Sequence, residues 1–408
     1  MAQRPYPIIT VNEKAERSLR AGHPWVYGEE TTGPDVPCQN GDIVDVVSKK
    51  GRWLGAGFLN DNSKIRVRLL SRNTNDRFDE AFWRRRLTYA LDYRQTVMGP
   101  DFPYSRLIFG EADSFPGLTV DLFGEVLVTE VLSLGTDRVK LLLYRLLVEL
   151  LAQRGIKVRA LYERNEGAIR VKEGLPQEKG FYPLDGLATD LDGHVTITEN
   201  GILYDVDYIN GQKTGFFLDQ KYNRRAAAAL APGRRVLDCF THTGAFALNC
   251  AKAGAARVTA VDISKDAVAL TRRNAALNNL DDKVDVLQAD VFDLLTELAQ
   301  TKQRVYDYII LDPPAFTKSG ATVKNAYRGY REINSKAMKL LPRGGYLATC
   351  SCSHFMTADL FCQMLREAAH DASVNLRQIE DRRQSPDHPI LWGVPETEYL
   401  KFYLFQIV

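Results

Sequence analysis

The chain has 408 residues, of which 45% are hydrophobic and 25% are charged, and its formal net charge is +2 at pH 7. This length exceeds what a single hydrophobic core usually serves, so two or three globular domains are expected. The nearly balanced charge excludes a protein that attracts nucleic acid through its overall field, so any RNA-binding surface must come from local basic patches.

The sequence carries no signal for export or for a membrane. No apolar run approaches the roughly 20 residues that a membrane span needs, and the first residues, Met1 to Tyr6, lack the apolar core of a signal peptide. A cytoplasmic protein with reduced thiols is therefore predicted. None of its six cysteines forms a Cys-x-x-Cys pair, so neither a metal site nor a disulfide is expected.

Residues 1–73 have the pattern of a small β-rich domain. Short strands are expected within it at 41–48, 53–59 and 64–70. Because alternate residues of a strand point to the same face, Lys64, Arg66 and Arg68 share one face of the third strand. Eleven Lys and Arg against eight Asp and Glu in this domain favour RNA contact through that face. An ordinary solvated strand face explains the same pattern equally well.

A polar linker at 71–76 leads into a second region, 77–190, with a mixed α+β pattern. Its expected elements are a helix at 78–95, a hairpin at 118–131, a helix at 137–153 and a strand at 158–163. The first helix carries Arg84, Arg85 and Arg86. A basic run of this kind is usually the solvated side of a helix, and we favour that interpretation over RNA contact.

The third region, 191–408, begins with a hairpin at 195–210, where Asn200-Gly201 suits a type I′ turn. From about residue 211 strands and helices alternate. Strands are expected near 235–239, 257–262, 284–288, 306–312, 344–350, 374–379 and 399–407, and helices near 219–230, 244–253, 265–279, 325–341 and 356–369. Such alternation predicts an α/β domain, with a mostly parallel sheet covered on both faces.

Acidic residues stand at the ends of the first three strands of this region: Asp238, Asp262 and Asp290. Ligands of α/β proteins bind at these carboxyl ends. The loop after the first strand, Phe240 to Gly244, has one glycine where a dinucleotide fingerprint needs three to approach a pyrophosphate. S-adenosylmethionine has no phosphate, so it is the predicted cofactor. Asp262 should then accept hydrogen bonds from both ribose hydroxyls and Asp290 should bind the adenine amino group, although each acid alone could be an ordinary cap.

The other residues predicted to bind the cofactor flank these acids or precede the first strand. They are Gln220, Phe240, Thr241, Gly244, Ile263, Val291, Asp312 and Pro313. The two aromatic residues Phe216 and Phe217 have two equal interpretations. They could pack in the core, or they could line the methionine end of the cofactor with Gln220.

Two further segments point to the chemistry. Asp312-Pro-Pro-Ala-Phe316 ends the fourth strand, and Cys350-Ser-Cys352 ends the fifth. Carbon 5 of a pyrimidine is a poor nucleophile, and a thiolate that adds to carbon 6 transfers electron density to carbon 5. Cys352 has the position for such a thiolate, which requires a lowered pKa. Cys350 lies deeper in the strand and is assigned to packing.

Asp312 is predicted to hydrogen-bond the amino group and ring nitrogen of cytosine. Pro314 and Phe316 would then form part of the base pocket, with Phe316 stacking on the base. A base can enter such a pocket only when it is unstacked, so the substrate would be single-stranded, looped or flipped. His354 could shuttle a proton, but a polar residue at the rim is the favoured interpretation.

Together these residues resemble a family: the large-subunit ribosomal RNA cytosine-carbon-5 methyltransferases that contain a PUA domain. Gly22-His-Pro-Trp-Val-Tyr27 is similar to the PUA signature. Further blocks that resemble the family are Lys213 to Gln220, Asp312-Pro-Pro-Ala-Phe316, Ser351-Cys-Ser353, Asp387-His-Pro389 and Glu398-Tyr-Leu-Lys401. The resemblance implies three domains: an RNA-binding PUA domain at 1–73, a central α+β domain at 77–190, and a Rossmann-like class I methyltransferase domain at 191–408. It also implies the strand order 3-2-1-4-5-7-6 in the last domain and ribosomal RNA as partner.

One departure from the wider cytosine-carbon-5 methyltransferases leaves a step open. Many of them carry a second cysteine beside Asp-Pro-Pro, where this chain has Pro313-Pro314-Ala315, so the base that removes the carbon-5 proton is unidentified. Three alternatives also stay open: N-methylation of an RNA base, a nicotinamide oxidoreductase, and a non-catalytic RNA-binding scaffold. Nothing in the sequence indicates the oligomeric state, so a homodimer is left open.

Overall fold

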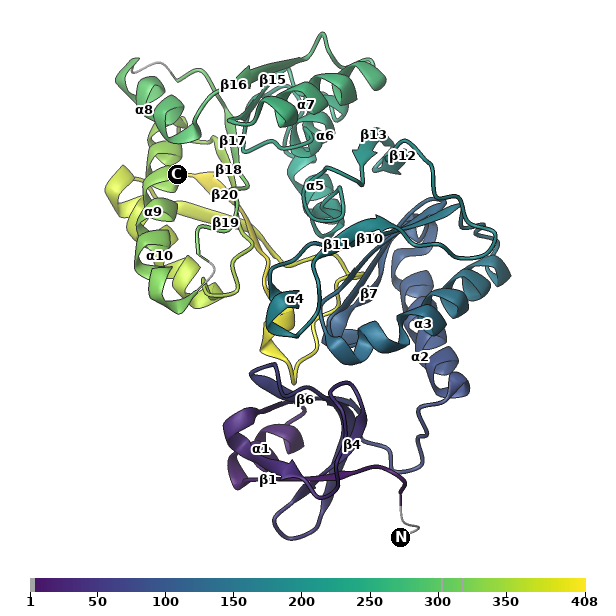
Figure 1. Ribbon diagram of the computed structural model, residues 1–408. Coiled ribbons are helices and arrows are strands. Elements are labelled where there is room, and N and C mark those ends of the chain that lie inside the picture. Colours follow the sequence, from purple (N-terminus) through teal and green to yellow (C-terminus); the bar gives the residue numbers. More distant parts are fainter. Residues whose placement is uncertain (1–3, 302–303, 318) are drawn as a thin grey trace. The chain divides into compact units, whose positions relative to one another are not determined.

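The computed structural model describes residues 4–301, 304–317 and 319–408. Its contacts divide the chain into two compact units (Figure 1). The first unit comprises Met1–Val195, Val206–Leu218 and Pro386–Thr397, and the second comprises Thr196–Asp205, Asp219–Ser385 and Glu398–Val408. The chain thus leaves the second unit after Ser385 and returns to it at Glu398. The three domain boundaries expected from the sequence stay a prediction.

The N-terminal part of the first unit is a six-stranded sheet with the order β2-β6-β5-β4-β1-β3. Its elements are β1 (Ile8–Val11), α1 (Glu13–Arg20), β2 (Trp25–Tyr27), β3 (Thr31–Pro34), β4 (Ile43–Ser48), β5 (Trp53–Leu59) and β6 (Ile65–Ser71). Val26, Val44 and Val67 are fully buried in its core. The last three strands were predicted. The first three strands and the helix were not, because elements of three to eight residues show too little periodicity.

The rest of the first unit is a five-stranded sheet with the order β11-β10-β9-β8-β7. Its elements are α2 (Glu80–Met98), β7 (Tyr104–Phe109), β8 (Leu118–Phe123), β9 (Val126–Val131), α3 (Leu134–Gln153), β10 (Ala160–Asn165), α4 (Ile169–Lys172) and β11 (Glu178–Phe181). The arginine run on α2 is engaged with the protein itself. Arg84 binds Glu149 at 2.7 Å, Arg85 binds Asp76 at 2.7 Å, and Arg86 donates to the Leu70 carbonyl at 3.0 Å. This supports the structural interpretation of the run.

A hairpin of β12 (His194–Glu199) and β13 (Ile202–Asp207) follows. Asn200 and Gly201 both have positive φ, 53° and 74°, as the predicted type I′ turn requires. Short 3-10 helices occur elsewhere: η1 (Gly28–Glu30), η2 (Gly99–Asp101), η3 (Gly110–Asp113), η4 (Leu218–Gln220), η5 (Gly320–Thr322) and η6 (Pro395–Thr397). In the part of the chain that the structure describes, no helix is both long and apolar enough to cross a bilayer.

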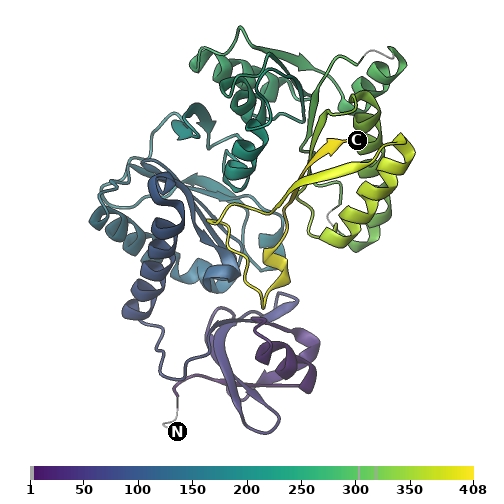
Figure 2. The same cartoon turned by 180° about the vertical axis from the view of Figure 1, so that it is seen from behind.

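The second unit is built on a seven-stranded sheet with the order β16-β15-β14-β17-β18-β20-β19. Its strands are β14 (Arg235–Cys239), β15 (Arg257–Asp262), β16 (Val284–Gln288), β17 (Tyr308–Leu311), β18 (Tyr346–Ser351), β19 (Leu376–Arg382) and β20 (Lys401–Ile407). In chain order this is 3-2-1-4-5-7-6, which confirms the expected Rossmann-like class I fold. The C-terminal strand β20 lies between β18 and β19 and is antiparallel to both. Figure 2 shows this yellow strand from the back of the molecule.

Six helices flank this sheet: α5 (Lys221–Ala228), α6 (Ala245–Lys252), α7 (Lys265–Leu277), α8 (Val291–Thr301), α9 (Val323–Leu340) and α10 (Ala358–Ala372). Figure 1 shows α8, α9 and α10 on one side of it and α5, α6 and α7 on the other. The central strand β17 is buried along its whole length, as expected for a parallel strand covered on both faces. Helix α8 was not predicted. The sheet brings the ends of β14 to β18 to one edge.

Candidate active site

The loop between β14 and α6 has an unusual backbone. Phe240, His242 and Gly244 have φ values of 63°, 51° and 80°, in the left-handed region that non-glycine residues rarely adopt. A Cβ atom at Gly244 would lie 2.7 Å from Cγ2 of Thr271, so only glycine fits there. Strained loops of this kind occur at ligand sites, where the surrounding structure holds them in place.

Asp238, at the end of β14, is a fully buried carboxylate with one unsatisfied oxygen. Its Oδ2 accepts hydrogen bonds from Thr241 Oγ1 at 2.5 Å and from the Ala247 N–H at 3.0 Å. Its Oδ1 is buried and has no hydrogen-bond partner among the described residues. Buried polar atoms are nearly always paired, so this oxygen fits a hydrogen-bond donor of the predicted cofactor. Burial raises the pKa of Asp238 to about 7.

Because the pKa of Asp238 is raised, the free energy of unfolding should depend on pH. An unfolded Asp titrates near pH 3.8, whereas Asp238 titrates near pH 7 in the folded protein. Between these values the folded state holds a proton that the unfolded state has lost, so stability falls as pH rises through that range. In Asp238→Asn the fall should be smaller. Thermal unfolding of both proteins between pH 4 and 8, without cofactor, measures the difference. Parallel curves would contradict the buried titration.

Asp262, the last residue of β15, and Ile263, which follows it, have the geometry expected of a nucleoside site. The Asp262 carboxylate is held by the N–H groups of His242 at 3.0 Å and Ser264 at 2.9 Å, one on each oxygen. Each oxygen keeps a second lone pair, which suits the two ribose hydroxyls. The side chain of Ile263 is 63% exposed. An exposed apolar side chain beside such a carboxylate suits packing against adenine.

The third predicted acid has a structural role as well. Asp290 Oδ1 accepts from the Phe292 N–H at 2.7 Å and so caps the start of α8. This is the ordinary interpretation that the sequence had left open, and Oδ2 stays available for adenine. The side chain of Val291 is 3% exposed and belongs to the hydrophobic core. A cofactor contact of Val291 would therefore have to come from its main chain, not from its side chain.

Asp312 follows β17 and is tied to Gln220, which the sequence had placed at the same site. Gln220 Nε2 donates to Asp312 Oδ1 at 3.1 Å, and Gln220 itself is held by Asn223 at 2.7 Å. The thiol of the fully buried Cys350 also hydrogen-bonds Asp312. Burial, reinforced by the nearby Asp219, raises the pKa of Asp312 to about 6. The carboxyl group is therefore poised to gain or lose a proton near neutral pH.

Cys352 lies immediately after β18 and is partly exposed. Burial of the sulfur, with the negative charges of Asp312 and Asp219, raises its pKa to about 12. The expected lowered pKa is therefore wrong for the protein without substrate. The physical reason is that the sequence showed neither how deeply the sulfur is buried nor that Asp219 lies near it.

Lys401 is a site residue to which sequence reasoning gave no role. It begins β20, opposite Ser351 of β18, and is 3% exposed. Its Nζ donates to the carbonyls of Ser353 at 2.6 Å and Tyr399 at 2.7 Å. Burial lowers its pKa to about 8. The pairing register of two strands 50 residues apart brings this lysine to Cys352, and no local sequence signal reveals that register.

The residues predicted to bind the base are placed less clearly. The Phe316 ring lies 4.6 Å from that of Tyr330 and 5.9 Å from that of Phe292, so packing accounts for part of its surface. Pro314 is exposed. His354 is exposed and makes an edge contact with Phe355 at 5.6 Å, which agrees with a residue at the rim. The sequence left Phe216 equally able to pack in the core or to line the methionine end of the cofactor, and in the structure it is 2% exposed.

The basic face predicted on β6 is largely neutralised by acids. Arg68 binds Glu111 at 3.0 Å and Glu173 at 2.9 Å, with 12% of its side chain exposed. Arg66 binds Asp61 at 2.6 Å. Only Lys64 is exposed without an ion pair among the described residues. These ion pairs, formed with segments far away in the sequence, favour the structural interpretation of Arg68, and RNA contact through this face stays a prediction.

Comparison with known proteins agrees with this geometry. Residues 185–406 match a family model described as S-adenosylmethionine-dependent methyltransferase, and residues 9–72 match a PUA-like domain. A ribosomal RNA large subunit methyltransferase I from Klebsiella pneumoniae is 36% identical over all of both chains. A protein of the same name from Shewanella denitrificans is 41% identical over 96% of this chain and 97% of its own.

Solved structures show the same fold. A candidate S-adenosylmethionine-dependent methyltransferase from Streptococcus mutans superposes with a TM-score of 0.81 at 21% identity, covering 98% of this chain and 99% of its own. A candidate methyltransferase solved in complex with S-adenosylhomocysteine gives the same TM-score and coverage. The chain therefore belongs to the S-adenosylmethionine-dependent methyltransferases, in the group with a PUA-like domain whose relatives are named ribosomal RNA large subunit methyltransferase I.

Proposed function

We propose that this protein methylates carbon 5 of a cytosine in large-subunit ribosomal RNA. The RNA substrate is inferred from the names of relatives that match the full chain. The observation that carries the chemistry is the juxtaposition of Asp312 and Cys352. They follow β17 and β18, which are paired neighbours in the sheet, beside the acids that fit the cofactor. A carboxyl group and a thiol at one edge are the two groups that this reaction needs.

The cofactor fits the residues that the fold supplies. The unpartnered Asp238 Oδ1, the free lone pairs of Asp262 and the exposed Ile263 offer a hydrogen-bond acceptor for the amino-acid end, acceptors for the ribose and an apolar surface for adenine. S-adenosylmethionine supplies an electrophilic methyl group when bound there.

The protein's own residues then act on the base. The Cys352 thiol gives its proton to water, and its thiolate forms a bond to carbon 6, while the Asp312 carboxyl donates its proton to the ring nitrogen and accepts it back later. The electron pair released into the ring makes carbon 5 nucleophilic. After carbon 5 has gained its methyl group, water or a base takes its proton. The electron pair of that C–H bond forms the double bond between carbons 5 and 6, and Cys352 leaves carbon 6 as a thiolate. Gln220 keeps Asp312 oriented throughout.

One observation favours a second candidate, methylation of a nitrogen of an RNA base. The raised pKa of Cys352 means that its thiol is protonated in the free protein, and nitrogen methylation needs no thiolate. In that reaction Asp312 would position the amine instead.

Identification of the modified nucleoside decides between the two. Large-subunit RNA from cells that lack the protein is incubated with the purified protein and S-adenosylmethionine and then digested for mass spectrometry. 5-Methylcytidine is the expected product. An N-methylated nucleoside would establish the second candidate, and the absence of any methylated product from both naked RNA and partly assembled subunits would overturn the proposal.

A further inference from the structure

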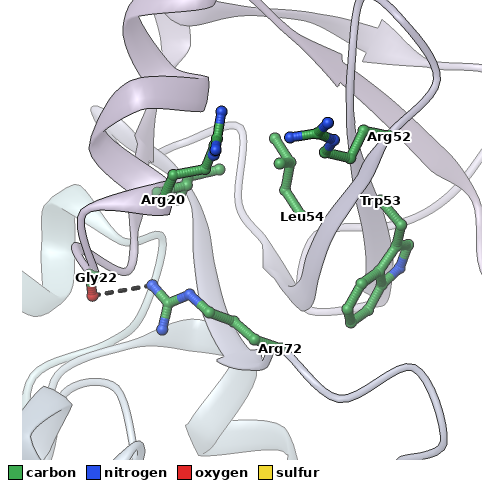
Figure 3. A pocket seen from close by; sticks show the side chains of 7 residues that line it. Arg20, Gly22, Arg52, Trp53, Leu54 and Arg72 are labelled. Carbon is green, nitrogen blue, oxygen red and sulfur yellow. Dashed lines mark hydrogen bonds between the residues drawn. The ribbon is translucent and has the colours of Figure 1, made fainter.

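A hollow of about 250 Å³ in the N-terminal sheet domain is lined by arginines from three separate segments. Arg20 ends α1, Arg52 precedes β5 and Arg72 follows β6. Figure 3 shows the guanidinium groups of Arg20 and Arg52 reaching toward the same space, with Arg72 on the α1 side. Three cations around one hollow repel one another, so the arrangement suits an anionic ligand.

The charges in this hollow are not neutralised by the protein. Arg72 donates to the carbonyls of Gly22 at 2.9 Å and His23 at 3.0 Å, which hold the guanidinium without cancelling its charge. Neither Arg20 nor Arg52 has a carboxylate partner among the described residues. The exposed Lys49 and Lys50 stand in the turn just before Arg52. The hollow therefore differs from the β6 face, where carboxylates bind Arg66 and Arg68.

An exposed tryptophan lies close to this hollow. Trp392 is 96% exposed and belongs to the segment Pro386–Thr397, which is part of the same unit. The adjacent Gly393 packs on Gly22, since a Cβ atom on Gly22 would lie 3.3 Å from Gly393 Cα. Gly22 itself lines the hollow. A large aromatic side chain is seldom left in solvent to this degree unless it contacts a partner.

We propose that the arginine hollow and Trp392 form one docking surface for single-stranded RNA, with the arginines on phosphates and the indole stacked on an unpaired base. Stacking is favoured because every base offers a flat face to an aromatic ring, whereas an acidic peptide would use only the cations. The proposal rests on RNA as the substrate and goes beyond it by locating a contact away from the site of methylation.

The test measures binding of a fluorescent twelve-residue oligocytidine to the full chain without cofactor. In Arg20→Ala/Arg52→Ala we expect a Kd at least tenfold higher and a salt dependence shallower by about 1.4 units, since each phosphate contact contributes roughly 0.7. Trp392→Leu should weaken binding severalfold, and Trp392→Phe less. Arg84→Ala is the matched control, because Glu80 and Glu149 already neutralise Arg84.

Unchanged binding in the double variant or in Trp392→Leu would overturn the docking surface. If the double variant loses binding but Trp392→Leu does not, the site takes anions without stacking and the proposal fails. These outcomes can be distinguished from a failure of the proposed reaction. If the parent protein produces 5-methylcytidine and the variants bind RNA normally, only the docking surface is refuted.

A second inference comes from the buried Lys401, an ammonium that lacks a counter-charge. Its Nζ is held by two carbonyl groups, and no carboxylate of the described residues lies within ion-pair distance. The nearby Glu398 is instead bound to Arg383 at 2.7 Å. Buried charges are normally paired with an opposite charge, so the missing anion requires an explanation. Cys352, whose thiol must become an anion in the proposed reaction, interacts electrostatically with Lys401.

We infer that Lys401 is the positioning residue that stabilises the Cys352 thiolate as its counter-ion. The Ser353 and Tyr399 carbonyls hold the ammonium in place. In the sheet, Lys401 pairs with Ser351, the residue just before Cys352. Two carboxylates, Asp312 and Asp219, oppose ionisation of the thiol, and the phenol of Tyr330 interacts with it. Glu398 and Arg383 act on Lys401 itself, with opposite signs. Lys401 is therefore the cation that favours the thiolate most directly.

The test is the pH dependence of alkylation of Cys352 by iodoacetamide, followed by mass spectrometry of the peptide that contains it, without RNA. Lys401→Gln keeps a donor for the carbonyls and removes the charge, so the rate of alkylation below pH 8, where Lys401 is charged, should fall at least tenfold at each pH. Lys401→Arg should retain most of the parent profile. Thermal unfolding checks that each variant is folded, and Lys401→Met serves as a second uncharged variant if Lys401→Gln is not.

An unchanged profile in a folded uncharged variant would overturn the role of Lys401. The role depends on the proposed reaction, but the two fail differently. If Cys352 proves dispensable for methylation, the reaction is wrong, whereas an unchanged alkylation profile in a protein that needs Cys352 refutes only the counter-ion.

Discussion

Replacing Cys352 by Ala is expected to abolish methylation, with a loss of about 10³-fold or more in kcat, because no other group can form the bond to carbon 6. Binding of S-adenosylmethionine should be unchanged, since the acids that fit the cofactor stand on β14 to β16 and not on β18. Steady-state methylation of ribosomal RNA measures the loss, and calorimetry measures cofactor binding.

A covalent trap makes the same prediction more specific. RNA that contains 5-fluorocytosine cannot lose the substituent at carbon 5 after methyl transfer, so the parent protein should remain attached to it. Cys352→Ala should form no adduct. The matched control is Cys362→Ala. Cys362 is also partly exposed, but it lies on helix α10 and its thiol donates to the Tyr403 hydroxyl at 3.2 Å. Full activity in Cys352→Ala, or an adduct that survives in it, would contradict the mechanism.

Replacing Asp312 by Asn is expected to lower kcat by about 10²-fold or more with little change in the KM for RNA. Asn preserves the shape of the side chain and can still bind Gln220, but it cannot deliver a proton to the ring nitrogen of cytosine. General acid catalysis typically contributes a factor of 10²–10⁴. Steady-state kinetics over a range of RNA concentrations separates kcat from KM.

The ratio of kcat between the parent and Asp312→Asn should depend on pH, and the pKa of Asp312 gives the direction. With a pKa raised to about 6, the Asp312 carboxyl is protonated below that pH and ionised above it. Its advantage over Asn should therefore be greatest in acid and fall as pH rises through about 6. Ionisation of the thiol has the opposite pH dependence. Asp312→Asn removes a negative charge that raises the pKa of Cys352, so above pH 6 the thiol ionises more readily in the variant, which lowers the ratio in the same direction. A ratio that increases with pH would show that the carboxylate, and not the carboxyl, is the active form.

Much of the cofactor side of the site was predictable because it is encoded locally. Strands β14, β15 and β16 begin and end at the predicted residues, since each is a short run bounded by turn residues and has an acid within two residues of its end. Gly244, the single glycine of the loop after β14, was identified for the same reason, because the conformation of that loop depends on five consecutive residues. In the structure a side chain cannot fit at Gly244.

The electrostatic state of the site could not be predicted in this way. The sequence placed Cys352 and Asp312 at neighbouring strand ends, but it did not show the burial of the thiol or the nearby Asp219, which with Asp312 raise the pKa of the thiol. Helix α8, by contrast, was predictable and was missed: Val291, Leu294, Leu295 and Leu298 have the i, i+3, i+4, i+7 spacing of an amphipathic helix.

The sequence by itself therefore determined the α/β domain, its strand order through family resemblance, and the acids and the thiol at the strand ends. These features depend on contiguous residues, whose periodicity and turns act over a few positions. Only the tertiary structure decided which charges meet: Lys401 beside Cys352, Glu111 and Glu173 on Arg68, and Gly393 against Gly22. Coulomb interactions and packing act between groups close in space. Strand register and chain crossings bring these groups together from positions that are 43 to 371 residues apart.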